Sequence, residues 1–414
     1  MMNQQAADSS SPPASGWGGV FALALGAFAL VASEFMPVSL LTPVASELQG
    51  TEGQAGQAIT VSGLFALLTS LSISALAGRL DRKVLLAALT LLMILSGSVA
   101  AFAPNYFSFM VGRALIGVAI GGFWSMSAST AMQLVSKDQV PRALAVVNGG
   151  NALATVLAAP LGSLLASIIG WRWAFFTIVP VAAIALAWQL KSLPKMKPQA
   201  RPRSVNIFGL LRDRRVALGM AGVSLFFMGQ FTLFTYLRPF LETAAGVGAG
   251  TLSFLLLVIG IAGFVGTILI GSLLKTGLYR TLITIPLVMA AIAIALPFAA
   301  PSLGATAVLL AVWGLVGTAA PVGWWTWLAW TLPDDAEAGG GLMVAVVQLA
   351  IGLGAGVGGL LYDQLGYQAT FGAGAVLLVV ASGLAVQTSR ANSGHVSGAG
   401  HGIDPDPHQS GAGA

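Results

Sequence analysis

The chain has 414 residues and carries too few charges for a soluble protein. Only 8% of its residues are charged, 56% are hydrophobic and the mean hydropathy is +0.86, whereas a soluble domain carries about 25% charged residues. The net charge of +5 would indicate a nucleic-acid partner in a soluble protein, but here the basic residues lie in short breaks between apolar runs. This pattern is typical of membrane topology. We therefore expect the lipid bilayer as a partner and no nucleic acid.

The residues that catalysis or metal binding needs are missing from the apolar runs. Cysteine is absent, and His395, His401 and His408 all lie in the polar tail. A membrane-bound enzyme would need clustered nucleophiles or metal ligands within its spans, so we expect no enzyme, no metal site and no cofactor. Residues 1–16 lack Lys and Arg, so no signal peptide is predicted, and the first apolar run should remain as an anchor.

Twelve apolar runs are each long enough to cross a ~30 Å hydrocarbon core as a helix. The fold class predicted from them is an all-α polytopic membrane protein with twelve transmembrane helices. The runs cover residues 17–41, 54–77, 84–103, 106–132, 141–168, 172–190, 215–241, 250–273, 281–300, 304–331, 338–361 and 368–388.

The two halves of the chain repeat each other at an offset of about 200 residues. The stretch GWRWAF from Gly170 matches GYQATF from Gly366, RALIG from Arg113 matches WGLVG from Trp313, and Pro37 corresponds to Pro239. The shared order predicts two pseudo-symmetric six-helix bundles. The predicted domains are a disordered N-terminus at 1–16, a first bundle at 17–190, a cytoplasmic linker at 191–214, a second bundle at 215–388 and a disordered tail at 389–414.

The Lys and Arg residues predict the orientation in the membrane. With the N-terminus inside, sixteen of them fall in cytoplasmic loops and ends, and two, Arg172 and Arg238, fall outside. Because cytoplasmic loops are enriched in Lys and Arg, we expect both termini in the cytoplasm. The inner membrane of a bacterium is the expected location.

Glu34 and Arg113 are the candidates for proton coupling. Glu34 is the only acid well inside a predicted span, and Arg113 is the only charge in the run from Tyr106 to Gln133. A charge there costs roughly 2.5–3.5 kcal/mol by insertion scales. At 1.5 Å per residue, both residues fall in the outer half of the membrane. We expect them to pair, with Glu34 gaining and losing a proton; a static ion pair that fixes two helices is the alternative.

Other polar and aromatic residues are candidates for a substrate cavity. Amide and hydroxyl groups beside aromatic faces suit a planar heterocycle that bears hydroxyl groups, such as a nucleoside, and hydrogen bonding between helices is the alternative role. The run GLGAGVGG from Gly352 to Gly359 lies within a span, so we interpret it as small-residue packing and not as a phosphate loop. The cavity candidates are Phe123, Trp124, Asn148, Asn151, Gln230, Thr232, Tyr236 and Gln348.

The loop AGRLDRKVLL and the fifth span carry motifs of a known family. Gly78, Arg79, Asp81 and Arg82 in this loop resemble the cytoplasmic signature of the major facilitator superfamily without its second glycine. In that family the acid and bases form a cytoplasmic gate; a positive-inside anchor is the alternative. The fifth span, NGGNALATVLAAPLGS, resembles the antiporter motif, with Ala159 where Gly is expected.

Together with GGFWSMSA and GWRWAFF, these motifs resemble the drug:proton antiporter branch of that superfamily, and within it the bacterial purine ribonucleoside efflux pumps. The resemblance covers about residues 34–384 and implies the major facilitator fold, proton-driven antiport and export of inosine-like or guanosine-like solutes and purine analogues. It implies a small-molecule substrate and protons as partners, and we expect a monomer. A sugar exporter of the arabinose type or a broad multidrug exporter is the alternative, and a membrane sensor without transport is a further one.

Overall fold

The computed structural model describes residues 16–77, 80–196, 207–333 and 336–399, and all of its regular elements in these ranges are helices. Two are short 3₁₀ helices, η1 (Lys137–Gln139) and η2 (Ile207–Arg212). The α-helices are α1 (Trp17–Glu47), α2 (Glu52–Ala77), α3 (Arg82–Ala101), α4 (Tyr106–Leu134), α5 (Val140–Ile169), α6 (Trp171–Phe176), α7 (Ile178–Ser192), α8 (Arg214–Phe234), α9 (Leu237–Thr243), α10 (Ala249–Ala299), α11 (Leu303–Gly317), α12 (Ala320–Thr331) and α13 (Ala336–Ala399).

These helices make twelve membrane crossings within the described ranges. Eleven segments are long and apolar enough to span a bilayer, but one of them, Ala338–Asn392, has 55 residues. A helix of that length would extend about 80 Å, far more than the ~30 Å core. Gly366 breaks it with φ 80° and ψ 179°, so the segment crosses twice. The predicted all-α fold and its spans are confirmed.

The repeat seen in the sequence recurs in the backbone. Gly170 has φ 84° and separates α5 from α6, and Gly366 has φ 80° at the matching place in the second half. A positive φ costs glycine almost nothing, whereas a residue with a Cβ is strained there. Both halves therefore turn into their last span through a glycine that the turn requires.

Local sequence signals fix several helix starts. Oδ1 of Asn105 accepts from the backbone N–H of Ser108, and the hydroxyl oxygen of Ser108 accepts from the backbone N–H of Asn105, so α4 begins with a capping box. The side chain of Asp213 caps α8 by accepting from the N–H of Arg215, and that of Ser302 caps α11 by accepting from the N–H of Ala305. Each such cap satisfies an N–H that the first helical turn leaves unpaired.

Prolines inside the spans do not end them. The first span was expected to stop near residue 41, but α1 continues past Pro37 and Pro43 to Glu47. A transmembrane helix tolerates proline where another group bonds the carbonyl that loses its partner. The chain also stays helical to Ala399, beyond the expected tail boundary at 389, where the Nδ2 group of Asn392 donates to the hydroxyl of Tyr279. Residues 400–414 lie outside the described ranges.

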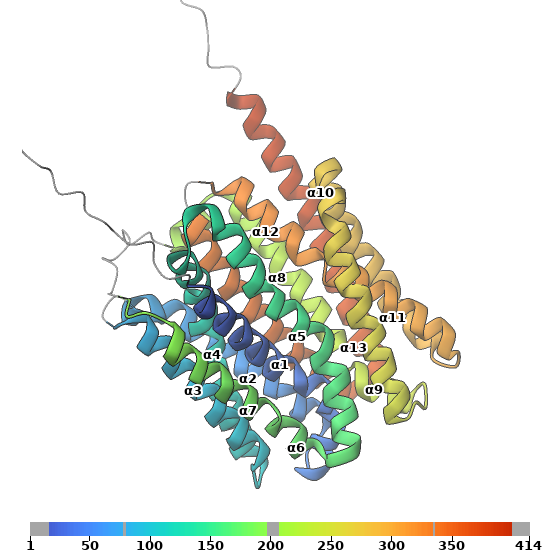
Figure 1. Cartoon of the computed structure of the whole chain (residues 1–414). Helices are drawn as coiled ribbons and strands as arrows, with labels where there is room; N and C mark the ends of the chain where they lie inside the picture. The colour runs from blue at the N-terminus through green and yellow to red at the C-terminus, as the bar shows by residue number, and fades with distance from the viewer. Residues whose placement is uncertain (1–15, 78–79, 197–206, 334–335, 400–414) are drawn as a thin grey trace, which may run out of the picture.

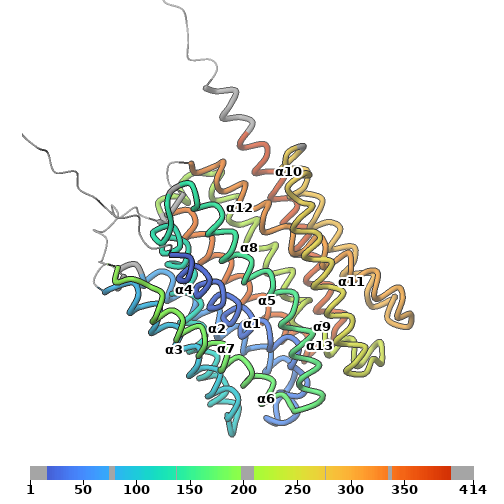
Figure 2. Tube along the Cα trace, in the orientation of Figure 1, coloured from blue at the N-terminus to red at the C-terminus, as the bar shows by residue number. Residues whose placement is uncertain are grey.

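The buried apolar side chains form two cores that follow the two halves of the chain. One consists almost wholly of side chains from residues 20–196 and the other of side chains from residues 216–385. We call the helices α1–α7 the first bundle and α8–α13 the second bundle (Figures 1 and 2). An even number of crossings returns the chain to its starting side. We call that side the terminal end, and the opposite side, where α1 passes to α2, the distal end.

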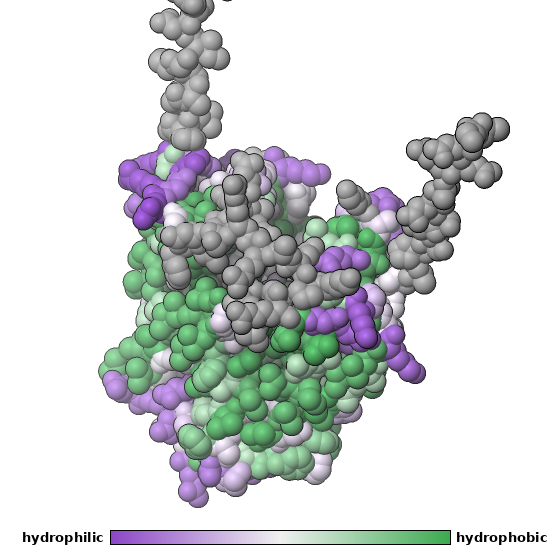
Figure 3. Space-filling view, turned by 90° about the vertical axis from the view of Figure 1, so that its left-hand side faces the viewer, coloured by the Kyte–Doolittle hydropathy of each residue, from purple (hydrophilic) through white to green (hydrophobic). Residues whose placement is uncertain are grey.

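The outer surface is apolar across the middle of the molecule. Figure 3 shows hydrophobic side chains over the middle of one face and hydrophilic ones at both ends. Large apolar side chains in mid-helix are exposed, among them Leu95, Ile268 and Val376. This arrangement is expected of a surface that contacts lipid chains.

Glycines bring the bundles together from the middle of the membrane to the distal end. A Cβ at Gly63 of α2 would lie 2.7 Å from the carbonyl oxygen of Gln348 on α13, and one at Gly359 would lie 2.9 Å from that of Gly53. A Cβ at Gly354 would lie 2.4 Å from the carbonyl oxygen of Met228 on α8. The run Gly352–Gly359 therefore packs α13 against α2 and α8 at once, which confirms its interpretation as a packing stripe.

Candidate functional site

Arg113 is buried in the core of the first bundle, where backbone carbonyl groups surround its guanidinium. Its exposed fraction is 1%. Its Nη1 donates to the carbonyl oxygen of Ser33 at 2.9 Å, its Nε to that of Ala58 at 3.3 Å and its Nη2 to that of Glu34 at 3.4 Å. Nη2 also donates to the hydroxyl of Ser62 at 3.4 Å. This one charge therefore links α4 to α1 and α2.

Pro37 explains why Ser33 offers a free carbonyl oxygen. In an α-helix the carbonyl of residue i accepts from the N–H of residue i+4, and proline has no N–H. Pro37 lies four residues after Ser33 inside the continuous helix α1. The carbonyl oxygen of Ser33 therefore has no helical donor, and Nη1 of Arg113 donates to it instead.

The carboxyl group of Glu34 contacts the other bundle. Glu34 is 7% exposed and is the only acid among the described side chains that is buried. Gln348 on α13, itself 5% exposed, donates from Nε2 to Oε1 of Glu34 at 3.3 Å. The expected neighbourhood of Glu34 and Arg113 exists, but the expected direct ion pair does not form, because the guanidinium bonds backbone oxygens instead.

This geometry places a protonatable group at the seam between the two bundles. The carboxyl of Glu34 belongs to the first bundle and its hydrogen-bond donor, Gln348, to the second. If the bundles separate on this side, the carboxyl loses that donor and gains access to water.

A second buried arginine, Arg238, joins the bundles nearer the distal end and was not predicted as a functional residue. Arg238 lies on α9 and is 7% exposed. It donates through Nη1 to the carbonyl oxygen of Ser39 and pairs through Nη2 with Glu242 at 2.8 Å. Pro43 follows Ser39 by four residues, so this oxygen too lacks its helical donor. A proline four residues after a free carbonyl is the sequence signal that would have pointed here.

Asp363 adds a further link at the distal end. Its Oδ2 accepts from the hydroxyl of Thr51 at 2.6 Å, and its Oδ1 accepts from the N–H of Gly53 at 3.0 Å. These bonds join α13 to the start of α2. Among the described residues, the hydrogen bonds between the bundles thus lie from the level of Glu34 to the distal end, and the bundles are closed there.

Comparison with known proteins places this geometry in a family. The model of the Major Facilitator Superfamily matches residues 23–338, which is most of the chain. The chain belongs to the Major Facilitator Superfamily.

Two curated relatives of this major facilitator protein carry different names. It is 58% identical over 399 residues to the transcription regulatory protein OpdE of Pseudomonas aeruginosa, covering 95% of this chain and 99% of the relative. It is 40% identical over 351 residues to the purine ribonucleoside efflux pump NepI of Escherichia coli strain K12, covering 84% and 88%. A crystal structure of a bacterial homolog of the human lysosomal transporter Spinster matches the fold, with a TM-score of 0.72, 16% identity and coverage of 91% and 98%.

Three of the predicted cavity residues have structural partners in this conformation of the major facilitator protein. Phe123 is fully buried against Gly26 in the first core. Thr232 donates to the carbonyl oxygens of Met228 and Gly354. Tyr236 is fully buried in this conformation, and its hydroxyl donates to a carbonyl oxygen of α13 at 2.7 Å. The missing signal was the glycine pair on α2 and α13, Gly56 and Gly359, which makes room for this ring.

The remaining cavity candidates are more accessible. Asn148 is exposed on α5 and Asn151 is half-buried one turn further along. Trp124 is half-buried on α4, and Gln230 is half-buried on α8 with no hydrogen-bond partner for its buried Oε1 among the described residues. Nδ2 of Asn148 donates to the carbonyl oxygen of Leu144 at 3.0 Å, and Nε2 of Gln348 donates to Oε1 of Glu34.

The expected gate loop is only partly described. Gly78 and Arg79 lie outside the described residues. Asp81 caps α3 by accepting the backbone N–H of Lys83 at 2.8 Å, and Nη1 of Arg82 donates to the hydroxyl of Ser129 on α4 at 2.8 Å. Both bonds stay within the first bundle. The gate role remains a prediction.

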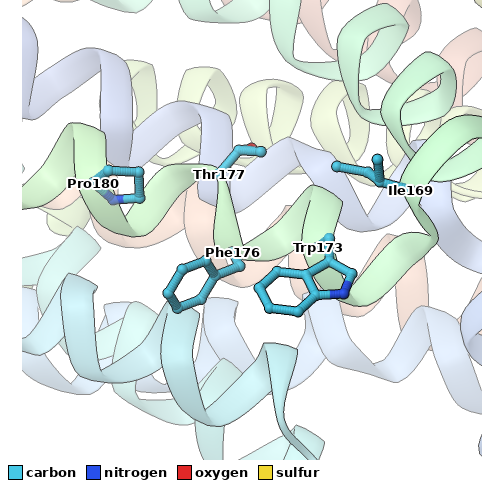
Figure 4. Close-up of a pocket in the computed structure, with 5 residues that line it drawn as sticks. All are labelled: Ile169, Trp173, Phe176, Thr177 and Pro180. Carbon is cyan, nitrogen blue, oxygen red and sulfur yellow. The ribbon is translucent and has the colours of Figure 1, made fainter.

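A hollow of about 450 Å³ at the distal end does not belong to the Glu34 region. Trp173, Phe176, Thr177, Pro180 and Ile169 line it (Figure 4). It holds no titratable side chain, and Trp173 is 53% exposed. Exposed aromatic rings near a helix end are typical of the membrane–water interface, so we assign this hollow to the lipid boundary.

Proposed function

We propose that this major facilitator protein is a proton-driven antiporter that exports purine ribonucleosides and purine analogues across the inner membrane. The terminal end faces the cytoplasm in this proposal, because the Lys and Arg residues gather there. The 40% identical relative named as a purine ribonucleoside efflux pump supports the substrate class.

The bond between Glu34 and Gln348 carries the proposal of proton coupling. A buried carboxyl whose hydrogen-bond donor belongs to the opposite bundle changes its surroundings whenever the bundles move. When the distal side opens, Glu34 meets external water and takes up a proton. When it closes and the terminal side opens, substrate enters, the proton leaves to the cytoplasm and the cycle can repeat. Arg113, fixed on backbone oxygens, supplies a constant positive charge beside this exchange.

Three amides and one aromatic ring are the proposed substrate contacts. Asn148 and Asn151 on the first bundle and Gln230 on the second bundle offer donors and acceptors, and Trp124 offers an aromatic face. A purine base with a ribose needs both kinds of contact. Because the amides come from both bundles, one solute can bridge them.

The test is transport in liposomes that contain the purified protein. With an acidic interior and an alkaline exterior, an antiporter accumulates radiolabelled inosine, and a protonophore abolishes the accumulation. Glu34→Gln should remove gradient-driven accumulation, since glutamine cannot release a proton. Glu52→Gln is the matched control, because Glu52 lies at the distal start of α2 and away from Glu34. Undiminished accumulation in Glu34→Gln liposomes would disprove the proposed role.

Competition separates the candidate substrates. Unlabelled inosine and guanosine should displace the label, whereas arabinose and a cationic dye should not. Displacement by arabinose alone would identify a sugar exporter, and displacement by the dye would identify a multidrug exporter.

The 58% identical relative named as a transcription regulatory protein favours a second candidate function, an effect on gene expression. We propose that such an effect follows from transport, since export lowers the cytoplasmic level of a regulatory solute. Transcript profiles of cells with the wild type, without the protein and with Glu34→Gln distinguish the two cases. The variant should match the deletion; a profile like the wild type would show regulation independent of proton-driven transport.

A further inference from the structure

A second hollow of about 450 Å³ lies on the outside of the second bundle, away from Glu34. The two spans of α10, Ala249–Lys275 and Gly277–Ala299, form its walls, and the end of α11 with Ala319, which precedes α12, forms its floor. Figures 1 and 2 show α10 and α11 at the edge of the molecule opposite α3. The hollow therefore faces the surrounding membrane and not the seam between the bundles.

Two glycines shape this groove. A Cβ at Gly266 would lie 1.9 Å from the carbonyl oxygen of Leu315, so α10 and α11 touch there and the groove ends. Gly277 has non-helical backbone angles, which separates the two spans of α10 at the terminal end. The second wall runs from Arg280 to Val288, about 12 Å at 1.5 Å per residue. This is most of one leaflet of a ~30 Å hydrocarbon core.

The walls are apolar and the terminal end of the groove is basic and polar. Leu273, 55% exposed, and Ile285 line its depth, and Arg280 is the one charged residue that lines it. Arg280 is exposed, and none of the ion pairs found among the described residues involves it. The hydroxyls of Thr281 and Thr284 donate to backbone oxygens, so toward a ligand their oxygens act as acceptors.

We propose that this groove binds an anionic phospholipid of the phosphatidylglycerol type from the leaflet at the terminal end. An acyl chain would occupy the apolar depth and the phosphate would meet the guanidinium of Arg280, which suits bidentate phosphate binding. The glycerol hydroxyls of the headgroup supply donors for the two threonine oxygens. A phosphatidylethanolamine headgroup fits less well, because its ammonium group meets the positive charge of Arg280.

The orientation predicted from the basic residues places this groove in the cytoplasmic leaflet. Anionic lipids give that leaflet a negative surface potential, and each Lys or Arg near it contributes about 1 kcal/mol of attraction. Loss of one such charge corresponds to roughly a five-fold weaker affinity. Lys275, exposed at the end of the first wall, adds positive charge nearby.

Native mass spectrometry of the full-length protein in detergent tests the proposal. Phosphatidylglycerol and phosphatidylethanolamine with identical acyl chains are titrated, and the dissociation constant of the first bound lipid is measured. The wild type should prefer phosphatidylglycerol. Arg280→Ala should weaken the affinity for phosphatidylglycerol by about five-fold and change the affinity for phosphatidylethanolamine little. Thr284→Phe should weaken the affinity for both lipids, because the phenyl ring introduced at this exposed position fills the groove.

Arg390→Ala is the matched control, since it removes an equal charge from an exposed position outside the groove. Its affinity for phosphatidylglycerol should equal that of the wild type. Equal affinity of the wild type for both lipids, unchanged binding by Arg280→Ala, or an equal loss in Arg390→Ala would each overturn the proposal. Size-exclusion profiles identical to that of the wild type establish that the variants are folded.

Discussion

At the scale of single residues, the two prolines of α1 determine where the buried arginines bind. Pro37 and Pro43 each free the carbonyl four residues earlier, and an arginine from another helix bonds each freed oxygen. Arg113 does so within the first bundle, whereas Arg238 does so across the seam. A carbonyl oxygen that proline leaves without a donor would be costly if it stayed unpaired, and here it binds a buried guanidinium.

This relation predicts a coupling between Pro37 and Arg113. Arg113→Met should destabilise the protein strongly, because a buried acceptor left without a donor costs about 1–3 kcal/mol. Pro37→Ala supplies an N–H for the carbonyl oxygen of Ser33. Arg113→Met should therefore destabilise the Pro37→Ala variant by roughly 1–2 kcal/mol less than it destabilises the wild type. Equilibrium unfolding in detergent measures this double-mutant cycle.

The control cycle pairs Pro37→Ala with Ser62→Ala. The hydroxyl of Ser62 is a weak acceptor of Arg113 at 3.4 Å and does not contact the freed carbonyl. These two changes should add within about 0.5 kcal/mol. If the changes in the free energy of unfolding for Pro37→Ala and Arg113→Met also add, the arginine does not replace the missing N–H.

At the scale of secondary-structure elements, the distal parts of α1, α2, α9 and α13 hold the bundles together. Arg238 of α9 bonds α1, and Asp363 of α13 bonds α2. These contacts are short and polar, and several are partly exposed. They can therefore break during a transport cycle at modest cost, whereas a large apolar interface could not.

Removing the carboxylate of Asp363 should favour opening at the distal end. Asp363→Ala deletes the acceptor of the hydroxyl of Thr51 and of the N–H of Gly53. Because these bonds are partly exposed, the closed arrangement should lose about 1 kcal/mol of stability, which shifts the opening equilibrium roughly five-fold. The chain has no cysteine, so Ile59→Cys provides a single reporter at a position that is 3% exposed beside the second core. Its labelling rate with an impermeant maleimide should rise about five-fold.

Asp138→Ala is the control for this experiment, since it removes an exposed carboxylate at the terminal end. Its labelling rate at position 59 should equal that of the unsubstituted reporter. A rate in Asp363→Ala equal to that of the reporter alone would show that these bonds do not hold the distal side closed.

At the scale of the whole molecule, α13 acts as the surface on which both bundles meet. Its glycines contact α2 on one side and α8 on the other. Because these contacts involve backbone atoms, an added side chain cannot be accommodated by a rotamer change. The closed arrangement of the distal side thus depends on the absence of side chains along this stripe and its partner on α2.

Gly63→Leu should shift the molecule toward a distal-open arrangement. Its Cβ would lie 2.7 Å from the backbone oxygen of Gln348, so the bundles must move apart. Spin labels attached at Ser46→Cys on the first bundle and Thr243→Cys on the second are both exposed near the distal end. Double electron–electron resonance measures the distance between them. The mean distance should lengthen by several Å. A displacement of about 1 Å relieves the clash at position 63, and the helices amplify it toward the distal end.

Gly372→Leu is the matched control, because a Cβ there has no atom within 4 Å. It should leave the distance distribution unchanged. An unchanged distribution in Gly63→Leu would mean that α2 and α13 separate or slide without opening the distal side.

The sequence alone determined the class, the crossings and the residues of interest. Long apolar runs define spans one at a time, since each needs only its own length and composition. Glu34 and Arg113 are visible because a charge in such a run is rare. The repeat of GWRWAF and GYQATF pairs Gly170 with Gly366, the two glycines that share a positive φ in the structure.

Only the tertiary structure decided which groups meet. It gave Glu34 a partner in Gln348, gave Arg113 backbone oxygens in place of a carboxylate, buried Tyr236 between glycines and brought Arg238 to α1. The physical reason is that these helices are apolar all round. Lipid and protein core are equally apolar, so the pattern along one helix does not reveal which face meets a neighbour. That choice depends on close packing between helices distant in the sequence.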